Sequence, residues 1–349
     1  MNKFNKYSRV ITTIVGILSL IISLGQSRQV LAAQSAFAAQ EQFSSAYQVV
    51  DTITVGSYPV GIAFNPRNGY MYVTNESDAT VSVIKAATNT VVTTVPVGLS
   101  PRAVTYNARN GDMYVSNTFS DTVLVIDHVT NAVTATIPVP VDEGCFHPFA
   151  MAYDPRNARM YVDCLSYTSV AVIDTLTNTV EALVTVGSSP EGIVFNPRNG
   201  YVYAANDHNG NVSVIDPSTN TVINSIELPP IWSGGSIELG YNPRNNYLYA
   251  TVSDADTVVV MDATTNQVVT TLGVGDYPLG VTFNQRDGNM YVANYGDGNV
   301  SVIDSTTNNV IATIPVGQGP QWLAINPRNG NLYVTNSISG TVSVISTTK

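Results

Sequence analysis

Few side chains in this sequence could do acid/base chemistry. The chain has three histidines, and two carboxylates, Asp142 and Glu143, shortly precede His147. Carboxylates near a histidine raise its pKa, so His147 is the candidate general acid or base. A lone surface histidine would look the same, so a catalytic role would need a converging partner.

Common catalytic motifs are missing from the sequence, which has no Gly-x-Ser-x-Gly turn, phosphate-binding glycine loop, His-Glu-x-x-His segment or Cys-x-x-Cys pair. Oxygen-rich turns at 254–256 and 295–299 contain Asp254, Asp256 and Asp297 and could ligate Ca²⁺, but neither matches an EF-hand loop. Asp, Asn and Gly are also ordinary turn residues. We therefore expect no cofactor, with Ca²⁺ as the ion best suited to these turns.

A repeated unit must position these residues. Tyrosine recurs at positions 72, 114, 161, 203, 249, 291 and 333, at spacings of 42, 47, 42, 46, 42 and 42. Each unit has a short apolar segment, an Asn-Pro-Arg-Asn-Gly-like turn, a Tyr-Val-Thr-Asn-like segment, a Val-Ser-Val-Ile-like segment and a Val/Thr-rich run. These are expected to be four strands, A to D. Seven units predict an all-β, seven-bladed β-propeller of four-stranded antiparallel blades.

The two ends of the chain are expected to close the ring. The last unit stops at Lys349 after its third strand, which would leave an exposed edge. Residues 49–56 align with residues 91–98 at an offset of 42. This N-terminal segment therefore supplies the fourth strand of blade seven, and residues 39–349 form one domain whose repeats start at about residue 47.

The first 38 residues have the layout of a secretory signal peptide. Lys3, Lys6 and Arg9 precede an uncharged run at 10–25, and an alanine-rich stretch follows, with cleavage expected after Ala38 or near Ala32. The alternative is an uncleaved membrane anchor, but the run of about fifteen residues is shorter than the roughly twenty needed to span a bilayer. After removal of the peptide we expect no transmembrane segment.

The expected mature chain is strongly acidic. Removing the first 38 residues leaves 11 basic against 25 acidic residues, a net charge of −14. A nucleic-acid partner is therefore not expected, because phosphate binding needs a basic surface. Repulsion likewise disfavours an anionic membrane surface.

The segments Tyr72-Val73-Thr74-Asn75 and Tyr333-Val334-Thr335-Asn336, each followed by a Val-Ser-Val-Ile segment, resemble the YVTN family of β-propeller repeat proteins. The resemblance covers essentially the whole chain after the signal peptide. It implies an exported seven-bladed propeller of the kind found in archaeal surface layers and bacterial cell envelopes. It implies no single activity, because fold and function are only loosely tied.

The two cysteines are expected to form a disulfide. Exported proteins meet oxidising conditions, and an even count of two permits one intramolecular bridge. Cys164 replaces the usual Asn at the end of strand B, and Cys145 lies in the insertion that enters the same blade. Two departures from the repeat in one blade favour a bond between them, and the alternative is a pair of free thiols.

Arginine occupies the A–B turn of every unit. The seven residues are Arg67, Arg109, Arg156, Arg198, Arg244, Arg286 and Arg328. We interpret them as structural, paired with the Asp that ends strand C in five blades or hydrogen-bonded in their turns. The opposite face, formed by the D–A and B–C turns, is then acidic, with Asp163 and Glu191 among the carboxylates assigned to these turns. That acidity either keeps the protein solvated or attracts a cationic ligand or partner.

Departures from the repeat point to a binding site on the D–A/B–C face. Trp322 and Glu238 occupy a strand-A position that is Gly or Ala in the other five blades, and Trp232 lies in the second insertion, at 229–235. The first insertion, 139–147, carries His147, Asp142 and Glu143. We predict a ligand site at the mouth of the axial channel, bordered by blades three, five and seven. The alternative is that these side chains plug the channel.

These observations favour an exported, non-enzymatic binding or cell-surface scaffold propeller, which is expected to be a monomer and to be secreted or held at the cell envelope. Its expected partner is an extracellular protein, peptide or saccharide. The alternative is a propeller lyase or hydrolase with a metal-assisted site at the axial funnel, for which a histidine and a carboxylate would have to converge.

Overall fold

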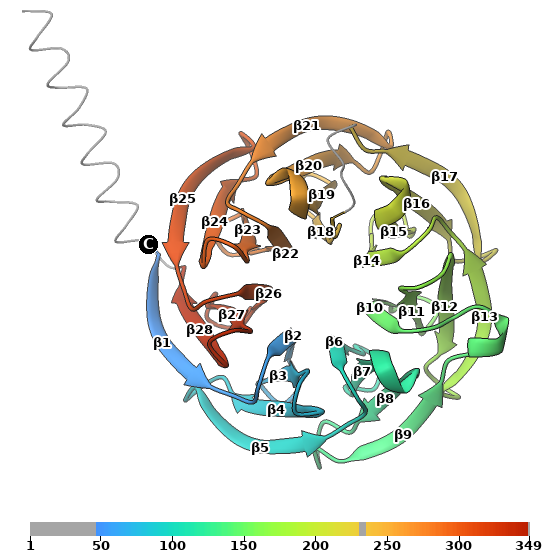
Figure 1. The fold of residues 1–349 in the computed structure, drawn as a ribbon, viewed down its shortest axis with the longest axis horizontal. Helices are drawn as coiled ribbons and strands as arrows, with labels where there is room; N and C mark the ends of the chain where they lie inside the picture. The colour runs from blue at the N-terminus through green and yellow to red at the C-terminus, as the bar shows by residue number, and fades with distance from the viewer. Residues whose placement is uncertain (1–46, 230–234, 348–349) are drawn as a thin grey trace, which may run out of the picture. The chain divides into compact units, whose positions relative to one another are not determined.

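The computed structural model describes residues 47–229 and 235–347 as a ring of seven four-stranded antiparallel sheets (Figure 1). In each sheet the strands follow one another outward from the axis. The expected propeller is therefore confirmed. The expected signal peptide and Trp232 lie outside the described residues. In the part of the chain that is described, no helix has the length and apolar character needed to cross a membrane.

The strand bounds repeat from blade to blade. Blade one consists of β2 (Pro59–Asn65), β3 (Tyr70–Asn75), β4 (Thr80–Lys85) and β5 (Thr90–Pro96). Blade two consists of β6 (Pro101–Tyr106), β7 (Met113–Asn117), β8 (Thr122–Ile126) and β9 (Val133–Pro138). Blade three consists of β10 (Pro148–Asp154), β11 (Arg159–Cys164), β12 (Ser169–Asp174) and β13 (Thr179–Thr185). Blade four consists of β14 (Pro190–Phe195), β15 (Val202–Asn206), β16 (Asn211–Asp216) and β17 (Thr221–Glu227).

The remaining blades follow the same order. Blade five consists of β18 (Leu239–Asn242), β19 (Tyr247–Val252), β20 (Thr257–Asp262) and β21 (Gln267–Gly273). Blade six consists of β22 (Pro278–Phe283), β23 (Asn289–Asn294), β24 (Asn299–Asp304) and β25 (Asn309–Pro315). Blade seven consists of β26 (Pro320–Ile325), β27 (Leu332–Asn336), β28 (Thr341–Ser346) and β1 (Gln48–Thr54). Short 3-10 turns η1 (Thr118–Ser120), η2 (Val141–Glu143), η3 (Asp207–Asn209) and η4 (Ser253–Ala255) interrupt the loops.

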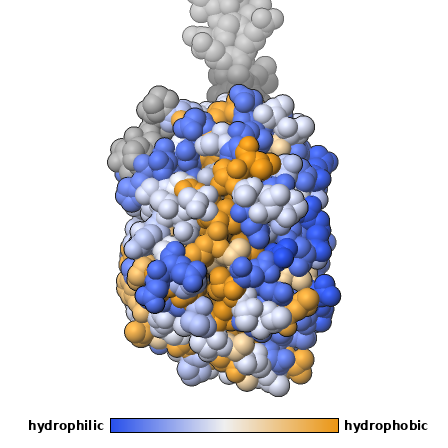
Figure 2. Space-filling model, turned by 90° about the vertical axis from the view of Figure 1, so that its right-hand side faces the viewer, coloured by the Kyte–Doolittle hydropathy of each residue, from blue (hydrophilic) through white to orange (hydrophobic). Residues whose placement is uncertain are grey.

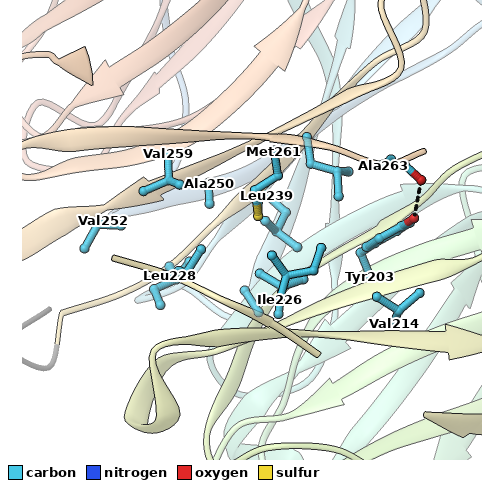
Figure 3. Close-up of a cluster of buried hydrophobic side chains, with 14 residues drawn as sticks. Tyr203, Val214, Ile226, Leu228, Leu239, Ala250, Val252, Val259, Met261 and Ala263 are labelled. Carbon is cyan, nitrogen blue, oxygen red and sulfur yellow. Dashed lines mark hydrogen bonds between the residues drawn. The ribbon is translucent and has the colours of Figure 1, made fainter. Parts of the chain in front are cut away.

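The core lies between neighbouring blades, because strands B and C are buried on both faces. The repeated tyrosine of strand B is fully buried in all seven blades. Its hydroxyl reaches the next blade, as when Tyr72 donates to Asn131 Oδ1 at 2.7 Å. Burial raises the pKa of Tyr72 to about 12, so this hydroxyl stays protonated as a donor. Figure 3 shows such an interface between blades four and five, where Tyr203 donates to the Ala263 carbonyl.

The N-terminal strand closes the ring as predicted. β1 pairs antiparallel with β28, from Gln48 opposite Ser346 to Thr54 opposite Thr341. Val55 N–H donates to the Gly340 carbonyl at 3.1 Å, and Ile53 is buried. β1 thereby covers what would otherwise be the free outer edge of blade seven.

The outer wall of the ring is formed by the D strands. Figure 2 shows the side on which β13 and β17 lie, where hydrophobic side chains form a band between hydrophilic ones. Val222 and Ile223 of β17 are among the exposed apolar residues of this wall. Apolar atoms make up a large part of the surface of most folded proteins, so these exposed side chains by themselves indicate no function.

The A–B turn arginines join neighbouring blades. They do so through hydrogen bonds to turn carbonyls and not through ion pairs with the strand-C Asp residues. Arg67 donates to the Asn110 and Arg109 carbonyls at 2.8 and 2.6 Å, and Arg328 donates to the Pro66 carbonyl at 2.5 Å. The Asp residues that end strand C instead accept N–H groups of their own turns, as Asp262 does from Thr264 at 2.7 Å. The turn hydrogen bonds are confirmed. The ion pairs with strand-C Asp are wrong, because each carboxylate already caps its own turn.

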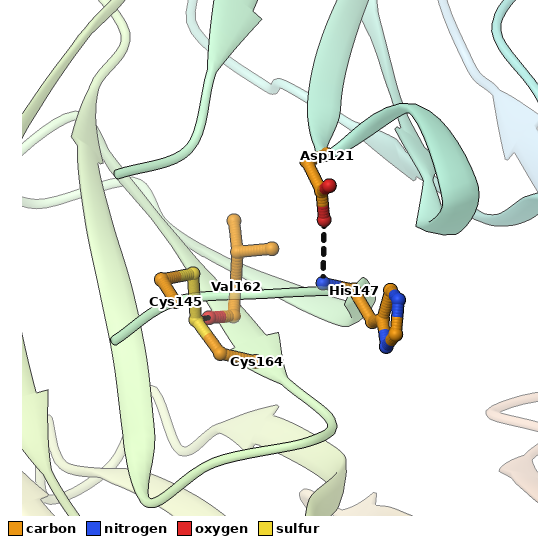
Figure 4. Close-up of a disulfide and its surroundings, with 5 residues drawn as sticks. All are labelled: Asp121, Cys145, His147, Val162 and Cys164. Carbon is orange, nitrogen blue, oxygen red and sulfur yellow. Dashed lines mark hydrogen bonds between the residues drawn. A yellow bond between two sulfur atoms is a disulfide. The ribbon is translucent and has the colours of Figure 1, made fainter. Parts of the chain in front are cut away.

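The predicted disulfide between Cys145 and Cys164 is present, and both residues are fully buried (Figure 4). It ties the insertion that enters blade three to the end of β11. The inserted loop is held a second time where His147 N–H donates to Asp121 Oδ1 at 2.9 Å. A long loop is thus fixed on the rigid blade.

Candidate functional site

The A strands of neighbouring blades approach closely around the axis. A Cβ added at Gly61 would lie 2.2 Å from the Arg102 carbonyl oxygen, and one at Gly192 would lie 2.5 Å from the Ile237 carbonyl oxygen. This explains why the position is Gly or Ala in most blades. Glu238 and Trp322 occupy the same position in their blades. The backbone hydrogen bonds show this: Glu238 N–H donates to the Thr251 hydroxyl and Trp322 N–H to the Thr335 hydroxyl, as Gly61 N–H does to the Thr74 hydroxyl.

The D–A/B–C face has a cavity of about 330 Å³ at the axial mouth. Trp322 and Glu238 both line it, so the structure brings together the two residues that the repeat singled out. Five aromatic side chains contribute to the wall: Tyr58, Phe149, Tyr277, Tyr295 and Trp322. Among the described residues the lining comes from six blades, all except blade four, and is thus broader than the three blades expected.

Trp322 reaches across the mouth. Its ring centroid lies 6.0 Å from that of Phe149 in blade three, and it packs against the core clusters on both sides of the axis. Arg102 lies over the same Phe149 ring at 5.3 Å and pairs with Glu76 at 3.1 Å. Trp322 and Glu238 also line an inner section of the channel of about 150 Å³. They therefore form the constriction between the mouth and the interior.

Three carboxyl groups gather near this constriction. Burial raises the pKa of Glu238 and Asp163 well above their usual values, and the neighbouring Glu191 carboxylate adds to both shifts. The pKa of Glu191 is also raised, mainly by burial, although a hydrogen bond with Ser236 opposes the shift. Carboxyl groups in such surroundings remain protonated or demand a positive neighbour.

Asp163 was expected in an exposed acidic turn but lies fully buried in β11. Its position in strand B belongs to Thr74 in blade one, where the hydroxyl accepts from Gly61 N–H at 2.7 Å and donates to the Arg102 carbonyl at 2.8 Å. Neither carboxylate oxygen of Asp163 has a hydrogen-bond partner. A buried polar group left in this way costs stability.

Replacing Asp163 by Thr is expected to stabilise the protein. Because the pKa of Asp163 is raised on folding, the native state binds the proton more tightly, and the free energy of unfolding falls as pH rises above about 4, the pKa of an unfolded aspartate. Asp163→Thr removes this loss and restores a hydroxyl that can be hydrogen-bonded, for a gain of about 1–3 kcal/mol at pH 7.

Denaturant unfolding measured from about pH 4.5 to about pH 8 checks this expectation, because the whole range lies above the pKa of about 4 of an unfolded aspartate. The variant should gain more over the parent at the alkaline end than at the acidic end. Asp142→Thr, a change at an exposed position of η2, serves as the control and should leave the pH dependence intact. A gain that does not vary with pH would show that Asp163 ionises freely in the folded protein.

Other acidic side chains of this face accept hydrogen bonds from backbone N–H groups of the adjacent loop. Asp78 accepts from Ser57 N–H at 2.7 Å, and Asp256 accepts from Tyr277 N–H at 3.0 Å. Asp297 accepts from Asp276 N–H at 3.0 Å. Two of the turns considered for Ca²⁺ thus use their carboxylates to join a B–C turn to the neighbouring D–A loop. The face is acidic partly because aspartate caps these turns well.

Three other predicted site residues, His147, Asp142 and Glu143, lie away from the mouth cavity. His147 bonds through Nδ1 to Ser166 Oγ at 2.7 Å, and Asp142 and Glu143 are exposed in η2. None of the three lines the cavity. The structure therefore does not bring His147 and the carboxyl groups of the mouth together.

Among the described residues, one group has possible metal ligands close together. It lies on the face formed by the A–B and C–D turns. Ligand atoms of Asp112, Asp127 and His128 are within 4.8 Å of one another, and His128 Nδ1 is 3.1 Å from Asp112 Oδ1. Asp127 Oδ1 already accepts from Thr130 N–H at 2.7 Å. The group is thus explained by hydrogen bonds within blade two.

Comparison with solved structures shows the fold alone. A chain of the hydrazine synthase of Kuenenia stuttgartiensis aligns with a TM-score of 0.74 at 20% identity, covering 84% of this chain and 96% of that one. A structure of a streptogramin B lyase aligns with a TM-score of 0.72 at 10% identity, with the same coverage of 84% and 96%. No protein-family model and no curated protein matches the sequence. The chain is thus a seven-bladed β-propeller, and its function must be argued from its own site.

Proposed function

We propose that this chain is a binding protein whose ligand enters the axial mouth on the D–A/B–C face. The main support is the meeting of Trp322 and Glu238 in one cavity of about 330 Å³, at positions where the other blades need Gly or Ala. Its volume is at the lower end of the about 300–1,000 Å³ that small ligands occupy. It suits one side chain of a peptide or protein, or a small organic group.

The chemistry of the mouth favours a cationic group. Five aromatic side chains surround the opening, and aromatic walls attract ammonium and guanidinium ions. Beneath them, Glu238, Glu191 and Asp163 have raised pKa values because they are buried close to one another. A positive group from the ligand would restore the ionised form of Glu238, which lines the cavity, and relieve this cost. Arg102 forms its ion pair with Glu76; a hydrogen bond with Trp322 and the charge of Arg102 lower the pKa of Glu238 by less than burial raises it.

Binding is favoured over catalysis. A lyase or hydrolase would place a histidine beside a carboxyl group or a set of metal ligands at the mouth. Of the described residues that line the cavity, none is a histidine. The likeness to a streptogramin B lyase, at 10% identity, carries the fold only. We therefore propose a non-enzymatic protein that binds an extracellular peptide or protein through a basic side chain.

The compartment forms part of the same proposal. A disulfide suits an oxidising compartment, and residues 1–38 have the layout of a signal peptide. The repeat motif of Tyr72–Asn75 resembles YVTN proteins of cell surfaces. We propose that the protein is exported as a monomeric propeller domain, 39–349, and is secreted or displayed at the cell envelope. Mass spectrometry of the exported protein should find its N-terminus near residue 39 or 33, whereas an intact Met1 would contradict export by cleavage.

Tryptophan fluorescence tests the mouth directly. The chain has two tryptophans, so Trp232→Phe leaves Trp322 as the only reporter. Titration with a lysine tetrapeptide should change the Trp322 emission and saturate. Glu238→Gln keeps the shape of the neutral acid but cannot become an anion, and should weaken this binding about tenfold, the effect of losing a charge-assisted hydrogen bond.

Two comparisons separate binding from stability. Glu238→Gln should not lower the melting temperature, because the buried acid that it replaces has a raised pKa. Trp322→Ala should lower it, because the indole packs against two core clusters. A glutamate tetrapeptide and a neutral oligosaccharide are the control ligands. Equal binding of either control, or unchanged affinity in Glu238→Gln, would rule out a cation site.

A further inference from the structure

The opposite mouth of the ring, where the A–B and C–D turns lie, has a larger cavity of about 640 Å³. Its wall consists of the ends of the A strands of blades two to six, and most of its side chains are apolar. Five aromatic residues contribute to it: Tyr106, Tyr153, Phe195, Tyr241 and Phe283. This volume lies within the range of about 300–1,000 Å³ found for small-molecule sites, which are mainly apolar with a few polar groups.

Arginine side chains lie beside this aromatic wall. The Arg156 guanidinium is 4.8 Å from the ring centroid of Phe195, and that of Arg244 is 5.6 Å from the ring of Phe283. Each arginine belongs to the blade that precedes its aromatic partner, so the contact is repeated around the ring. All seven A–B turn arginines are exposed. The rim of the funnel is therefore positive, although the chain as a whole is acidic.

The charge of this rim is poorly neutralised. Arg67, Arg244 and Arg328 donate to backbone carbonyls of the next blade, which stabilise a guanidinium without cancelling its charge. In the described part of the chain, one of the seven, Arg156, forms an ion pair with a carboxylate, that of Asp154. Arg109, Arg198 and Arg244 come from blades two, four and five, which line the cavity, and form no such ion pair among the described residues, although Asp287 interacts electrostatically with Arg244.

Acidic residues on this face lie elsewhere or are already bonded. Asp112 contacts His128, and Asp287 accepts from the Tyr291 hydroxyl at 2.5 Å. The strand-C Asp residues belong to the third strand from the axis, farther out than the arginines of the A–B turns (Figure 1). The face thus has a positive inner ring and a negative outer ring, so an anion is attracted at the centre and not at the periphery.

We propose that this funnel is a second binding site, which takes a small organic anion with an aromatic or aliphatic body. The apolar part would lie against Phe195, Tyr241 and Phe283, and a carboxylate, sulfonate or phosphate head would lie among the rim arginines. Arginine suits this role because its planar group bonds to such heads in a bidentate manner. The site is separate from the cation site of the opposite mouth, and its test does not depend on that proposal.

Anilinonaphthalene sulfonate is a suitable probe because it combines an aromatic body with a fixed negative charge. Fluorescence and calorimetric titrations should give saturable binding to one site, and the affinity should fall with added salt. Phenylnaphthylamine, its uncharged counterpart, should bind at least about tenfold more weakly, as expected when charge-assisted hydrogen bonds are lost.

Two variants locate the probe. Arg109 and Arg198 act electrostatically on the hydroxyls of Tyr153 and Tyr241 and are exposed, so the double change to Gln removes two rim charges with little effect on packing. It should weaken binding about tenfold or more. Thr282→Trp, which fills the funnel from β22, should abolish binding.

Lys85→Gln removes an exposed positive charge at the end of β4, outside the cavity lining; it is the matched control and should leave the affinity for the sulfonate unchanged. The melting temperature of each variant establishes that it is folded. Absence of saturable binding to the parent protein, or equal affinity for the charged and neutral probes with no effect of the arginine changes, would overturn the proposal.

Discussion

A protein that begins at Gly56, without Tyr47–Val55, is expected to lose cooperative unfolding and to aggregate. The deletion removes β1 and exposes the edge of β28, in which Val342, Val344 and Ile345 are fully buried in the closed ring. Each lost backbone hydrogen bond is worth about 0.5–1.5 kcal/mol, and several are lost from a total stability of about 5–15 kcal/mol.

A matched control begins at Ser45 and keeps β1. Its circular dichroism melting curve should be a single transition, whereas the protein without β1 should elute as a broad, high-mass species. A synthetic peptide of residues 47–56, added during refolding, should restore a monomer by pairing with β28. If the shortened protein stays monomeric with an unchanged melting temperature, β1 does not close the ring.

The second large effect concerns the disulfide. Cys145→Ala with Cys164→Ala is expected to lower the free energy of unfolding by about 3 kcal/mol, the chain-entropy estimate for a loop of about 20 residues. Alanine is chosen because both positions are fully buried and a serine hydroxyl would lack an assured partner. Guanidinium unfolding in the absence of reductant provides the measurement.

Reduction of the parent protein is the control for this effect. The unfolding free energies of the reduced parent and of the double variant should agree within about 1 kcal/mol, since small cavity effects remain in the variant. Titration of denatured, unreduced parent protein should find no free thiol. Two free thiols, or equal stability of parent and variant, would contradict a stabilising bond.

The fold was predictable because the repeat spacing fixes how many blades form and which turns share a face. Closure was predictable too, since residues 49–56 align with strand D of blade one. The partners of the arginines were not, because sequence shows that Arg67 and Asp127 emerge on one side but not that turn carbonyls of the next blade lie nearer. Radial distance from the axis, which separates A–B from C–D turns, is invisible in a single repeat.

The candidate site was predictable where a side chain broke the repeat. Trp322 and Glu238 were found because they replace Gly or Ala at the crowded axis. Asp163 carried the same signal, since it breaks a column of Thr, Ser and Ala, but it was counted with the acidic turns. His147 and Asp142 were selected because they are close together in sequence within an inserted loop, and that loop holds them away from the mouth cavity.

Cavity-lining residues that recur in most repeats were not predicted from the sequence. Tyr58 and Tyr277 share one D–A loop position and both line the mouth, but only the closed ring brings them together. The arginines and aromatic residues of the opposite funnel recur in most blades, so they do not stand out as departures from the repeat. A repeated side chain can have a structural role in each blade and still build a site where the blades meet at the axis.

Proton release on ligand binding distinguishes a cation site at the mouth from every other kind of site. Glu238 has a raised pKa in the free protein, so a lysine side chain that binds beside it should expel up to about one proton. Calorimetric titration of the lysine tetrapeptide at neutral pH, in two buffers of different ionisation enthalpy, measures this release. We predict net release for the parent protein and none for Glu238→Gln. Binding heats that are equal in the two buffers for the parent protein, or release that persists in the variant, would contradict the proposed role of the mouth.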